Sequence, residues 1–127
     1  MVDFRLELIL VPVSDVDRAK AFYPAQMGFN DDHDTQISDE VRVVQLTPPG
    51  SACSIVIGTG LTDKPPGSAA GLQLVVSDMD TAVADFTGRG LDVGEVQVLG
   101  APGRPGFKHI FFSDPDGNRW TVQEIRS

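Results

Sequence analysis

The sequence is poor in three features that would point to whole classes of protein: cysteine, basic residues and long apolar runs. Its 127 residues include one cysteine, Cys53, so no disulfide can form within the chain and a reducing compartment is expected. Ten Lys and Arg residues stand against 18 Asp and Glu residues, which gives a formal net charge of −8. This balance argues against binding of nucleic acid or of an anionic membrane surface, and it is compatible with a cationic ligand.

Long apolar runs are also missing. Residues 43–62 carry no charge, but Pro48, Pro49 and Gly58 interrupt them, so no membrane span is predicted. The first ten residues, "MVDFRLELIL", contain three charged side chains and no small-residue cleavage site, so no signal peptide is expected. We therefore expect a cytoplasmic protein in which residues 1–127 form a single domain.

The chain contains an internal repeat. The stretch "VPVSDVDRAKAFY" (residues 11–23) recurs as "LVVSDMDTAVADF" (residues 74–86), with Val, Ser, Asp, Asp, Ala and Ala at the same positions. A repeat this long indicates two copies of a half-domain. The copies are expected at about 1–60 and 71–127, with the Gly- and Pro-rich segment at about 58–70 as the linker.

Each copy predicts the same order of elements. A β-rich apolar run precedes a Ser-x-x-Asp motif, in which Ser14 or Ser77 is expected to cap a helix. Gly28 and Gly90 suit the helix ends, and Pro24 is expected to kink or shorten the first helix. Strands are predicted at 6–13, 29–34, 41–46 and 54–57, and again at 72–76, 93–98, 108–112 and 120–125. Each half therefore reads β-α-β-β-β, which predicts an α+β fold of two curved, mostly antiparallel sheets with one helix behind each.

The stretch "SDPDGNRW" (residues 113–120) allows two interpretations. Asp114 and Asp116 could form a catalytic acid–base pair, or the stretch could be a turn. Pro115 fixes the backbone for a turn, and Gly117 can adopt a positive φ. Because turn chemistry explains every position, we favour a hairpin between the last two strands.

With "PVSDVDRAKAFY" after the first strand and "FSDPDGN" before the last, the doubled βαβββ pattern resembles the vicinal oxygen chelate superfamily. That superfamily includes glyoxalase I, bleomycin-resistance proteins, extradiol dioxygenases and fosfomycin-resistance enzymes. The resemblance covers nearly the whole chain and is greatest to the short proteins named glyoxalase/bleomycin resistance. It implies a cup that holds a small organic molecule, an association with antibiotic resistance, and a homodimer.

The resemblance also implies where a divalent metal would be bound. The family's ligands stand on the first and last strands of each half, at positions that correspond here to Leu8, Gly71 and Thr121, with a fourth between residues 51 and 61. That last segment contains no His, Asp or Glu. Divalent ions need imidazole or deprotonated oxygen donors, so we expect no metal site of the family type and no cofactor.

The resemblance implies that the family's ligand positions point into the cup, and strand alternation assigns further residues to the same face, because successive side chains of a strand point to opposite faces. On this basis Trp120 and Val122 should point toward the helices. Arg104, in the loop "LGAPGRPGF", could close over an anionic ligand. The predicted ligand-binding residues are Leu8, Leu10, Gln45, Ser54, Gln73, Val75, Arg104, His109, Phe111, Thr121 and Gln123. Such a set suits a moderately hydrophobic organic ligand with hydrogen-bonding groups.

Two hypotheses on function follow. The first is a binding module, and the second is a glyoxalase-type lyase or isomerase, or a dioxygenase. The enzyme would work either without metal, with His109 as the acid–base residue, or with an off-pattern metal held by His33 and the acidic residues 31–40. The acidic run is more simply interpreted as a solvated loop. Cys53 has no neighbouring base and is not expected to be catalytic.

Overall fold

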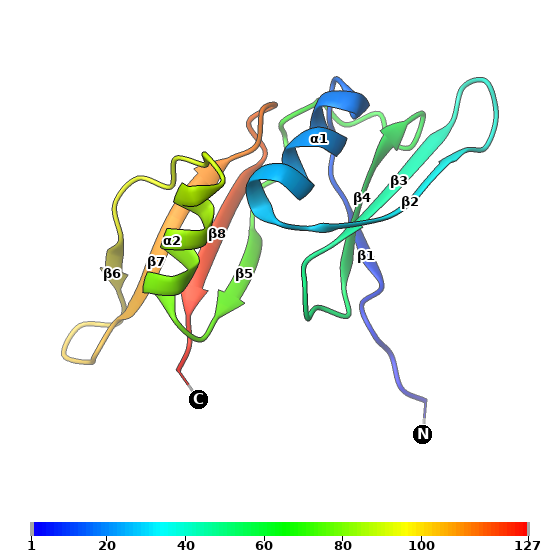
Figure 1. Cartoon of the computed structure of the whole chain (residues 1–127). Helices are drawn as coiled ribbons and strands as arrows, with labels where there is room; N and C mark the ends of the chain where they lie inside the picture. Colours follow the sequence, from blue (N-terminus) through cyan, green and yellow to red (C-terminus); the bar gives the residue numbers. More distant parts are fainter. Residues whose placement is uncertain (1, 127) are drawn as a thin grey trace.

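The computed structural model describes residues 2–126, which form two modules, each made of a four-stranded sheet and one helix (Figure 1). The first module consists of β1 (Leu8–Leu10), α1 (Val16–Met27), β2 (Asn30–Gln36), β3 (Arg42–Thr47) and β4 (Ser54–Thr59). The second module consists of β5 (Leu72–Val76), α2 (Met79–Gly88), β6 (Gln97–Leu99), β7 (Phe107–Ser113) and β8 (Arg119–Glu124).

Both sheets have the same topology, which confirms the predicted α+β fold. Their strand orders are β1-β4-β3-β2 and β5-β8-β7-β6. In each sheet the first strand pairs in parallel with the last, and the other pairings are antiparallel. No helix within residues 2–126 has the length and apolar character that crossing a membrane requires.

Two strands are shorter than predicted. β1 covers Leu8–Leu10 instead of 6–13, because its register with β4 extends only from Leu8 to Leu10. β6 covers Gln97–Leu99 instead of 93–98. Val93 lies in the core at 4% exposure without joining the sheet, so burial there does not produce a strand.

The helix starts differ from the prediction that Ser14 and Ser77 are the caps. The caps are Asp15 and Asp78, whose side chains accept hydrogen bonds from the backbone N–H groups of Arg18 (3.0 Å) and Thr81 (3.2 Å). A carboxylate one residue later in the chain takes the capping role, because it can reach the free N–H groups of the first turn. Ser14 uses its hydroxyl elsewhere, as shown below.

The helix ends follow the prediction in part. Gly28 caps α1 in the left-handed conformation, as expected, with φ at 74°. α2 ends at Gly88 and is capped by Arg89, so Gly90 follows one residue beyond the cap. Pro24 does not shorten α1, which continues to Met27, and its carbonyl accepts the N–H of Gly28 at 3.1 Å.

One hydrophobic core extends through both modules. On the first sheet, Val44, Leu46, Ile55 and Ile57 are buried on the side of α1. On the second sheet the buried side chains on the side of α2 are Ile110, Phe112, Trp120 and Val122. Trp120 and Val122 therefore point toward the helices, as the alternation predicted.

Aromatic rings join the two halves of this core. Tyr23 of α1 lies 5.9 Å from Trp120 of β8 between ring centroids, and Phe29 lies 5.6 Å from Tyr23 and 5.7 Å from Trp120. Burial of three aromatic side chains at this junction stabilises the relative position of the modules.

The "SDPDG" stretch is a turn, as predicted, between β7 and β8. Oδ1 of Asp114 accepts the backbone N–H groups of Asp116 (3.0 Å) and Asn118 (2.9 Å), and Gly117 has a φ of 97°. Positive φ is the conformation that glycine adopts without steric cost.

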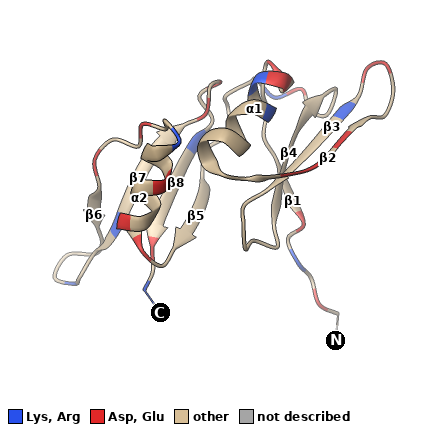
Figure 2. Ribbon diagram, in the orientation of Figure 1, with Lys and Arg blue, Asp and Glu red and all other residues tan. Residues whose placement is uncertain are grey.

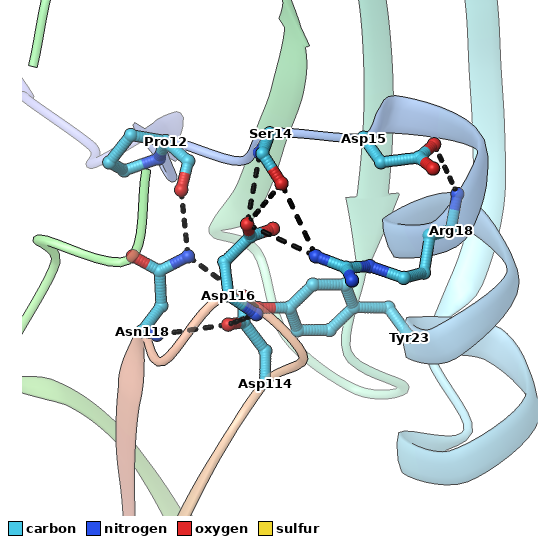
Figure 3. A network of polar contacts seen from close by, with 8 residues as sticks. All are labelled: Pro12, Ser14, Asp15, Arg18, Tyr23, Asp114, Asp116 and Asn118. Carbon is cyan, nitrogen blue, oxygen red and sulfur yellow. Dashed lines mark hydrogen bonds and ion pairs between the residues drawn. The ribbon is translucent and has the colours of Figure 1, made fainter. Parts of the chain in front are cut away.

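The turn also binds the first module through its side chains, as Figure 3 shows. Oδ1 of Asp116 accepts the N–H (3.1 Å) and the hydroxyl (2.5 Å) of Ser14, and it forms an ion pair with Arg18 at 3.1 Å. Oδ2 of Asp114 accepts the hydroxyl of Tyr23 at 2.7 Å. Both carboxylates are thus engaged in holding the modules together, an arrangement unlike that of a free acid–base pair.

Candidate functional site

The predicted site residues of the first module lie on the face of the first sheet that is turned away from α1. In the strand register, Leu8 is paired with Ser54, and both Leu10 and Gln45 are paired with Val56. Gln45 donates a hydrogen bond from Nε2 to Oγ of Ser54 at 3.1 Å, and Ser54 shares a second one with Thr47 at 2.7 Å. Leu8, Leu10, Gln45 and Ser54 are the first-sheet group. Ser54 is only 5% exposed, so the polar side chains of this group largely satisfy one another's hydrogen bonds.

The predicted residues of the second module also share one face, the face of the second sheet that is turned away from α2. Gln73 is paired with Thr121, Val75 with Gln123, His109 with Gln123 and Phe111 with Thr121. These six residues are the second-sheet group. The structure thus brings His109, Gln73 and Thr121 to the same face.

The second-sheet group is accessible and has a defined arrangement. Val75 and Phe111 are 62% and 42% exposed. Gln73 donates from Nε2 to Oε1 of Gln123 at 2.8 Å. The ring of His109 lies parallel to that of Phe111, with 6.1 Å between centroids and an interplanar angle of 8°. Nδ1 of His109 contacts the carbonyl oxygen of Phe107 at 2.8 Å, which leaves Nε2 available to a ligand.

The two groups do not form one enclosed cup within a chain. The two groups belong to separate sheets. Within the described residues 2–126, no hydrogen bond joins the first-sheet group to the second-sheet group. Arg104 is apart from both: it is exposed in the loop between β6 and β7, where its N–H bonds to the carbonyl of Ala101 at 3.2 Å. Within the described part of the chain, its guanidinium makes no hydrogen bond or ion pair.

Two pockets adjoin these residues. One of about 480 Å³ lies at the Gly71 end of the second sheet and includes Phe111 and Thr121 of the second-sheet group. A larger one of about 660 Å³ lies between the modules and includes only Val75 of the predicted residues. The larger concavity is therefore not where sequence alternation placed the ligand.

The donors at the family's metal positions do not fit a divalent ion. Leu8 has no donor atom in its side chain, and Gly71, just before β5, has no side chain. The residues of β4 on this face are Ser54, Val56 and Gly58, and Thr121 offers only a neutral hydroxyl. Such a set lacks the imidazole and carboxylate ligands that zinc, manganese and iron require. Within residues 2–126, no three His, Cys, Asp or Glu side chains are grouped as metal ligands would be.

The acidic residues near His33 form part of β2 rather than a solvated loop (Figure 2). β2 is exposed along its length, and its register with β3 shifts between Asp31 and His33. Charged residues and a bulge are common on edge strands, where they prevent pairing with other chains. The position of β2 at the edge of the sheet thus explains the acidic residues of the run 31–40 that lie in this strand.

Asp34 is the centre of the ion pairs on this strand. Its carboxylate accepts hydrogen bonds from the guanidinium of Arg42 (3.0 and 2.8 Å) and from the ammonium of Lys20 (2.7 Å). Arg42 also donates to the carboxylate of Asp17 at 2.8 Å. The hydrogen bonds from Arg42 and Lys20 hold the pKa of Asp34 well below its usual range. The same contacts raise the pKa values of Arg42 and Lys20. Asp34 is thereby occupied by two cations of the chain itself.

Sequence reasoning missed the buried polar network between the modules. Asn118, which is 0% exposed, donates from Nδ2 to the carbonyl of Pro12 (2.8 Å) and to Asp114 (2.8 Å), and its Oδ1 accepts the N–H of Ala69 (2.9 Å). Tyr23 accepts a hydrogen bond from Nε1 of Trp120 at 3.1 Å. Burial, together with the neighbouring Asp114, raises the pKa of Tyr23. The only signal in the sequence was the polar residue that follows the turn, Asn118.

The family is shown by a comparison with protein-family models. Residues 5–122 match the model described as the Glyoxalase/Bleomycin resistance protein/Dioxygenase superfamily. The chain belongs to this superfamily. A comparison of this superfamily member with curated proteins gave no match.

Solved structures of other superfamily members are similar over nearly the full length. One is TnmS3, described as an antibiotic binding protein from Streptomyces sp. CB03234, with 35% identity, 98% of each chain covered and a TM-score of 0.76. A glyoxalase/bleomycin resistance protein from the same organism has 36% identity and a TM-score of 0.72, with 94% of this chain and 100% of that chain covered. A superfamily member from Sphaerobacter thermophilus DSM 20745 has 29% identity and a TM-score of 0.75, with 97% and 98% covered.

Proposed function

We propose that this superfamily member binds a small organic molecule of the antibiotic class, and that it does so without a metal ion or cofactor. The observation that carries the proposal is the second-sheet group, which places accessible apolar side chains beside neutral hydrogen-bonding groups on one face. The description of TnmS3 as an antibiotic binding protein supports the same class of ligand.

The chemistry of this face suits a moderately hydrophobic ligand. Phe111 and Val75 offer apolar surface, and the stacked ring of His109 extends it. Gln73, Gln123 and Thr121 can donate and accept hydrogen bonds, which would fix the orientation of a ligand. The donor set at the family's metal positions supports binding without a metal, since none of these side chains is a usual ligand.

We propose further that a second copy of the chain completes the site, in a homodimer. The first-sheet and second-sheet groups lie on separate sheets of one chain, so neither encloses a ligand alone. The N-terminal segment also needs cover, because Phe4 and Leu6 are 92% and 66% exposed. Apolar side chains exposed to this degree on a monomer are typical of a surface that another chain covers. The single cysteine supports a reducing compartment, which we take to be the cytoplasm.

Native mass spectrometry tests the ligand and the metal together. The untagged protein is incubated with excess Zn²⁺, Ni²⁺, Mn²⁺ and Fe²⁺, desalted, and then titrated with bleomycin and a panel of hydrophobic antibiotics. We expect dimers that carry antibiotic and no metal. Retention of one metal ion per chain would contradict the metal-free site, and failure of every antibiotic to bind would contradict the ligand class.

Variants locate the site. Phe111→Ala should weaken the binding of any antibiotic found, because it removes apolar surface from the face. Ile37→Ala is the control, since Ile37 is also apolar and exposed (64%, against 42% for Phe111) but lies in the turn between β2 and β3. Equal affinities for the two variants would place the ligand somewhere else.

One observation favours a second function, a metal-free lyase or isomerase. Nδ1 of His109 is held by the carbonyl of Phe107, which fixes the ring and leaves Nε2 to accept a proton from a bound substrate. Glyoxalase-type activity assays on the wild type and on His109→Ala distinguish the two functions. Activity that His109→Ala abolishes, without loss of binding, would favour the enzyme.

A further inference from the structure

The pocket between the modules has the size and lining of a small-molecule site. Its volume is about 660 Å³, which lies within the range of pockets that hold drug-sized ligands. The first module contributes Met27 and Phe29 from the end of α1, and Pro48 and Pro49 from the loop between β3 and β4. The second module contributes Phe86 and other residues of β5 and α2.

This pocket, which we call the inter-module groove, is separate from the second-sheet group. Leu74 and Val76 line it, and in β5 these residues alternate with Gln73 and Val75 of the opposite face. Val75 contacts the groove from the edge of the sheet and is the only residue common to both. The groove therefore opens on the side of the sheets that carries the helices.

The apolar floor of the groove is part of the folded core. Met27, Phe29 and Phe86 are each at most 6% exposed, and all three belong to the core cluster. A floor built from core side chains is rigid, so a ligand would not have to order it on binding. The apolar lining suits an aromatic body.

The polar groups of the groove give it a negative charge. Asp78, Asp85 and Arg89 of the second module line it. Nε of Arg89 pairs with Oδ2 of Asp85 at 3.1 Å, and Nη1 reaches the carbonyl of Pro24 at 3.5 Å. Asp85 and Arg89 therefore neutralise each other, and the charge that remains at the groove is that of Asp78.

Asp78 is positioned to meet a cation. Its Oδ1 caps α2 through the N–H of Thr81 at 3.2 Å, and this hydrogen bond lowers the pKa of Asp78, so the side chain is ionised at neutral pH. Glu124 shares this end of α2 through the N–H of Met79 at 2.7 Å, and Arg126 pairs with Glu124 at 3.2 Å and also lowers the pKa of Asp78. Red segments are visible along α2 in Figure 2, where the helix contains Asp80 and Asp85, and the whole chain carries a net charge of −8.

We propose that the inter-module groove is a second binding site, distinct from the sheet faces, for an amphipathic organic cation with a flat aromatic body. The aromatic body lies against the apolar lining of the groove, which includes Pro48, Pro49 and Leu74 above the buried floor, and the cationic group faces Asp78. The proposal does not depend on what the sheet faces bind.

Ethidium is a suitable probe, because it is a flat aromatic cation whose fluorescence rises in an apolar environment. The full-length protein is titrated at low and at physiological salt. We expect saturable binding of one ethidium per chain, weakened by salt because the attraction is partly electrostatic. A wild-type protein that shows no saturable binding would overturn the proposal.

The internal repeat supplies a matched pair of variants. Asp78→Asn removes the charge at the groove and keeps a good capping residue, whereas Asp15→Asn makes the same change at the equivalent cap of α1. Both lower the net negative charge by one. Asp78→Asn should weaken ethidium binding about threefold to fivefold, as expected for an exposed ion pair, and Asp15→Asn should not. An equal effect of the two variants would show only general attraction to an acidic protein and would overturn the site.

A second pair tests the groove itself. Ala82→Trp fills it, and Ala84→Trp places the same side chain on an exposed position of α2 outside it. Circular dichroism first confirms that both are folded. Loss of binding in Ala82→Trp alone supports the groove, and wild-type binding in Ala82→Trp contradicts it. Phe111→Ala should bind ethidium normally, which keeps this test independent of the sheet faces.

Discussion

At the scale of single residues, the side chains that hold the modules together include buried polar groups as well as aromatic rings. Tyr23 is the only tyrosine of the chain, and its hydroxyl lies between Asp114 and Trp120. A buried hydroxyl with two partners stabilises the fold, but ionisation would place two negative charges side by side. The ionisation of the Tyr23 hydroxyl therefore depends on whether the junction between the modules is intact.

Ultraviolet absorbance can follow the ionisation of Tyr23 directly. Because its pKa is raised, we expect no tyrosinate absorbance near 295 nm at pH 10.5 to 11 while the protein stays folded. The unfolded chain should titrate near pH 10, the ordinary value for tyrosine. A folded protein that shows tyrosinate at pH 10 would contradict this arrangement.

The same shift sets the sign of the alkaline stability. A raised pKa means that Tyr23 contributes full stability below its unfolded value near pH 10, and that this contribution is lost as the pH rises above that value. Urea unfolding between pH 8 and 11 should therefore show stability falling above pH 10. Tyr23→Phe should start from a lower stability and lose less over this range.

Asn118 gives the largest expected effect of a single substitution. Asn118→Ala removes three hydrogen bonds and leaves the carbonyl of Pro12 and the N–H of Ala69 without that partner. Buried groups left unpaired cost about 1–3 kcal/mol each, so we expect a loss of about 2–4 kcal/mol in the free energy of unfolding. Asn30→Ala, at an exposed position, is the control and should change it by less than about 0.5 kcal/mol.

Which residues share a face could be predicted from the sequence, and which residues meet across the chain could not. The two-residue period of a strand, combined with the ligand positions that the resemblance implies, predicted Gln73, His109 and Thr121 on one face and Trp120 on the other, as the structure has them. Tyr23 and Asp114 are 91 positions apart, and Pro12 and Asn118 are 106 apart. No local period relates such residues, so their contact depends on how the modules pack.

At the scale of elements, the repeat placed both helices correctly but assigned their caps to the wrong residue. Ser and Asp are both good caps, and the motif "VSD" contains them side by side. The choice between them depends on tertiary contacts, because Ser14 bonds to Asp116 and Glu124 binds the first N–H of α2. β1 and β6 are short because only three residues of each pair with the neighbouring strand, although β4 and β7 continue further.

Substitutions at α2 test the corrected cap. Asp78→Ala should lower the melting temperature by a few degrees at pH 7, because the N–H of Thr81 loses its acceptor, while Ser77→Ala should change it little. The lowered pKa of Asp78 means that its stabilisation is present above about pH 4 and is lost as the pH falls. The difference between Asp78→Ala and wild type should therefore narrow at pH 3. A larger effect of Ser77→Ala than of Asp78→Ala would restore the serine as the cap.

At the scale of the whole molecule, the sequence predicted two similar halves but not their relation. The modules are joined through the aromatic cluster and the turn at 113–118, and their two sheets stay separate (Figure 1). The resemblance implied a cup that a homodimer shares or completes. The two groups of site residues meet in one cup only if a second copy brings its sheet to the first.

The N-terminal segment provides the test of that second copy. In "VDFRLE", Phe4 and Leu6 alternate with Asp3 and Arg5, so one side of an extended segment is apolar and the other charged. If this apolar side lies against a partner, Phe4→Ser with Leu6→Ser should convert the dimer to a monomer and weaken antibiotic binding together with it. Asp3→Ser with Arg5→Ser changes the other side and should leave both intact.

Light scattering coupled to size-exclusion chromatography measures the mass at several concentrations, and circular dichroism confirms that each variant is folded. A wild-type protein that is monomeric at micromolar concentration and still binds antibiotic would show that one sheet face is sufficient. A dimer that survives Phe4→Ser with Leu6→Ser would place the interface elsewhere, on the exposed apolar residues Val96, Val98 and Leu99 around β6. Ethidium binding in the inter-module groove should persist in the monomer, because both walls of that groove belong to one chain.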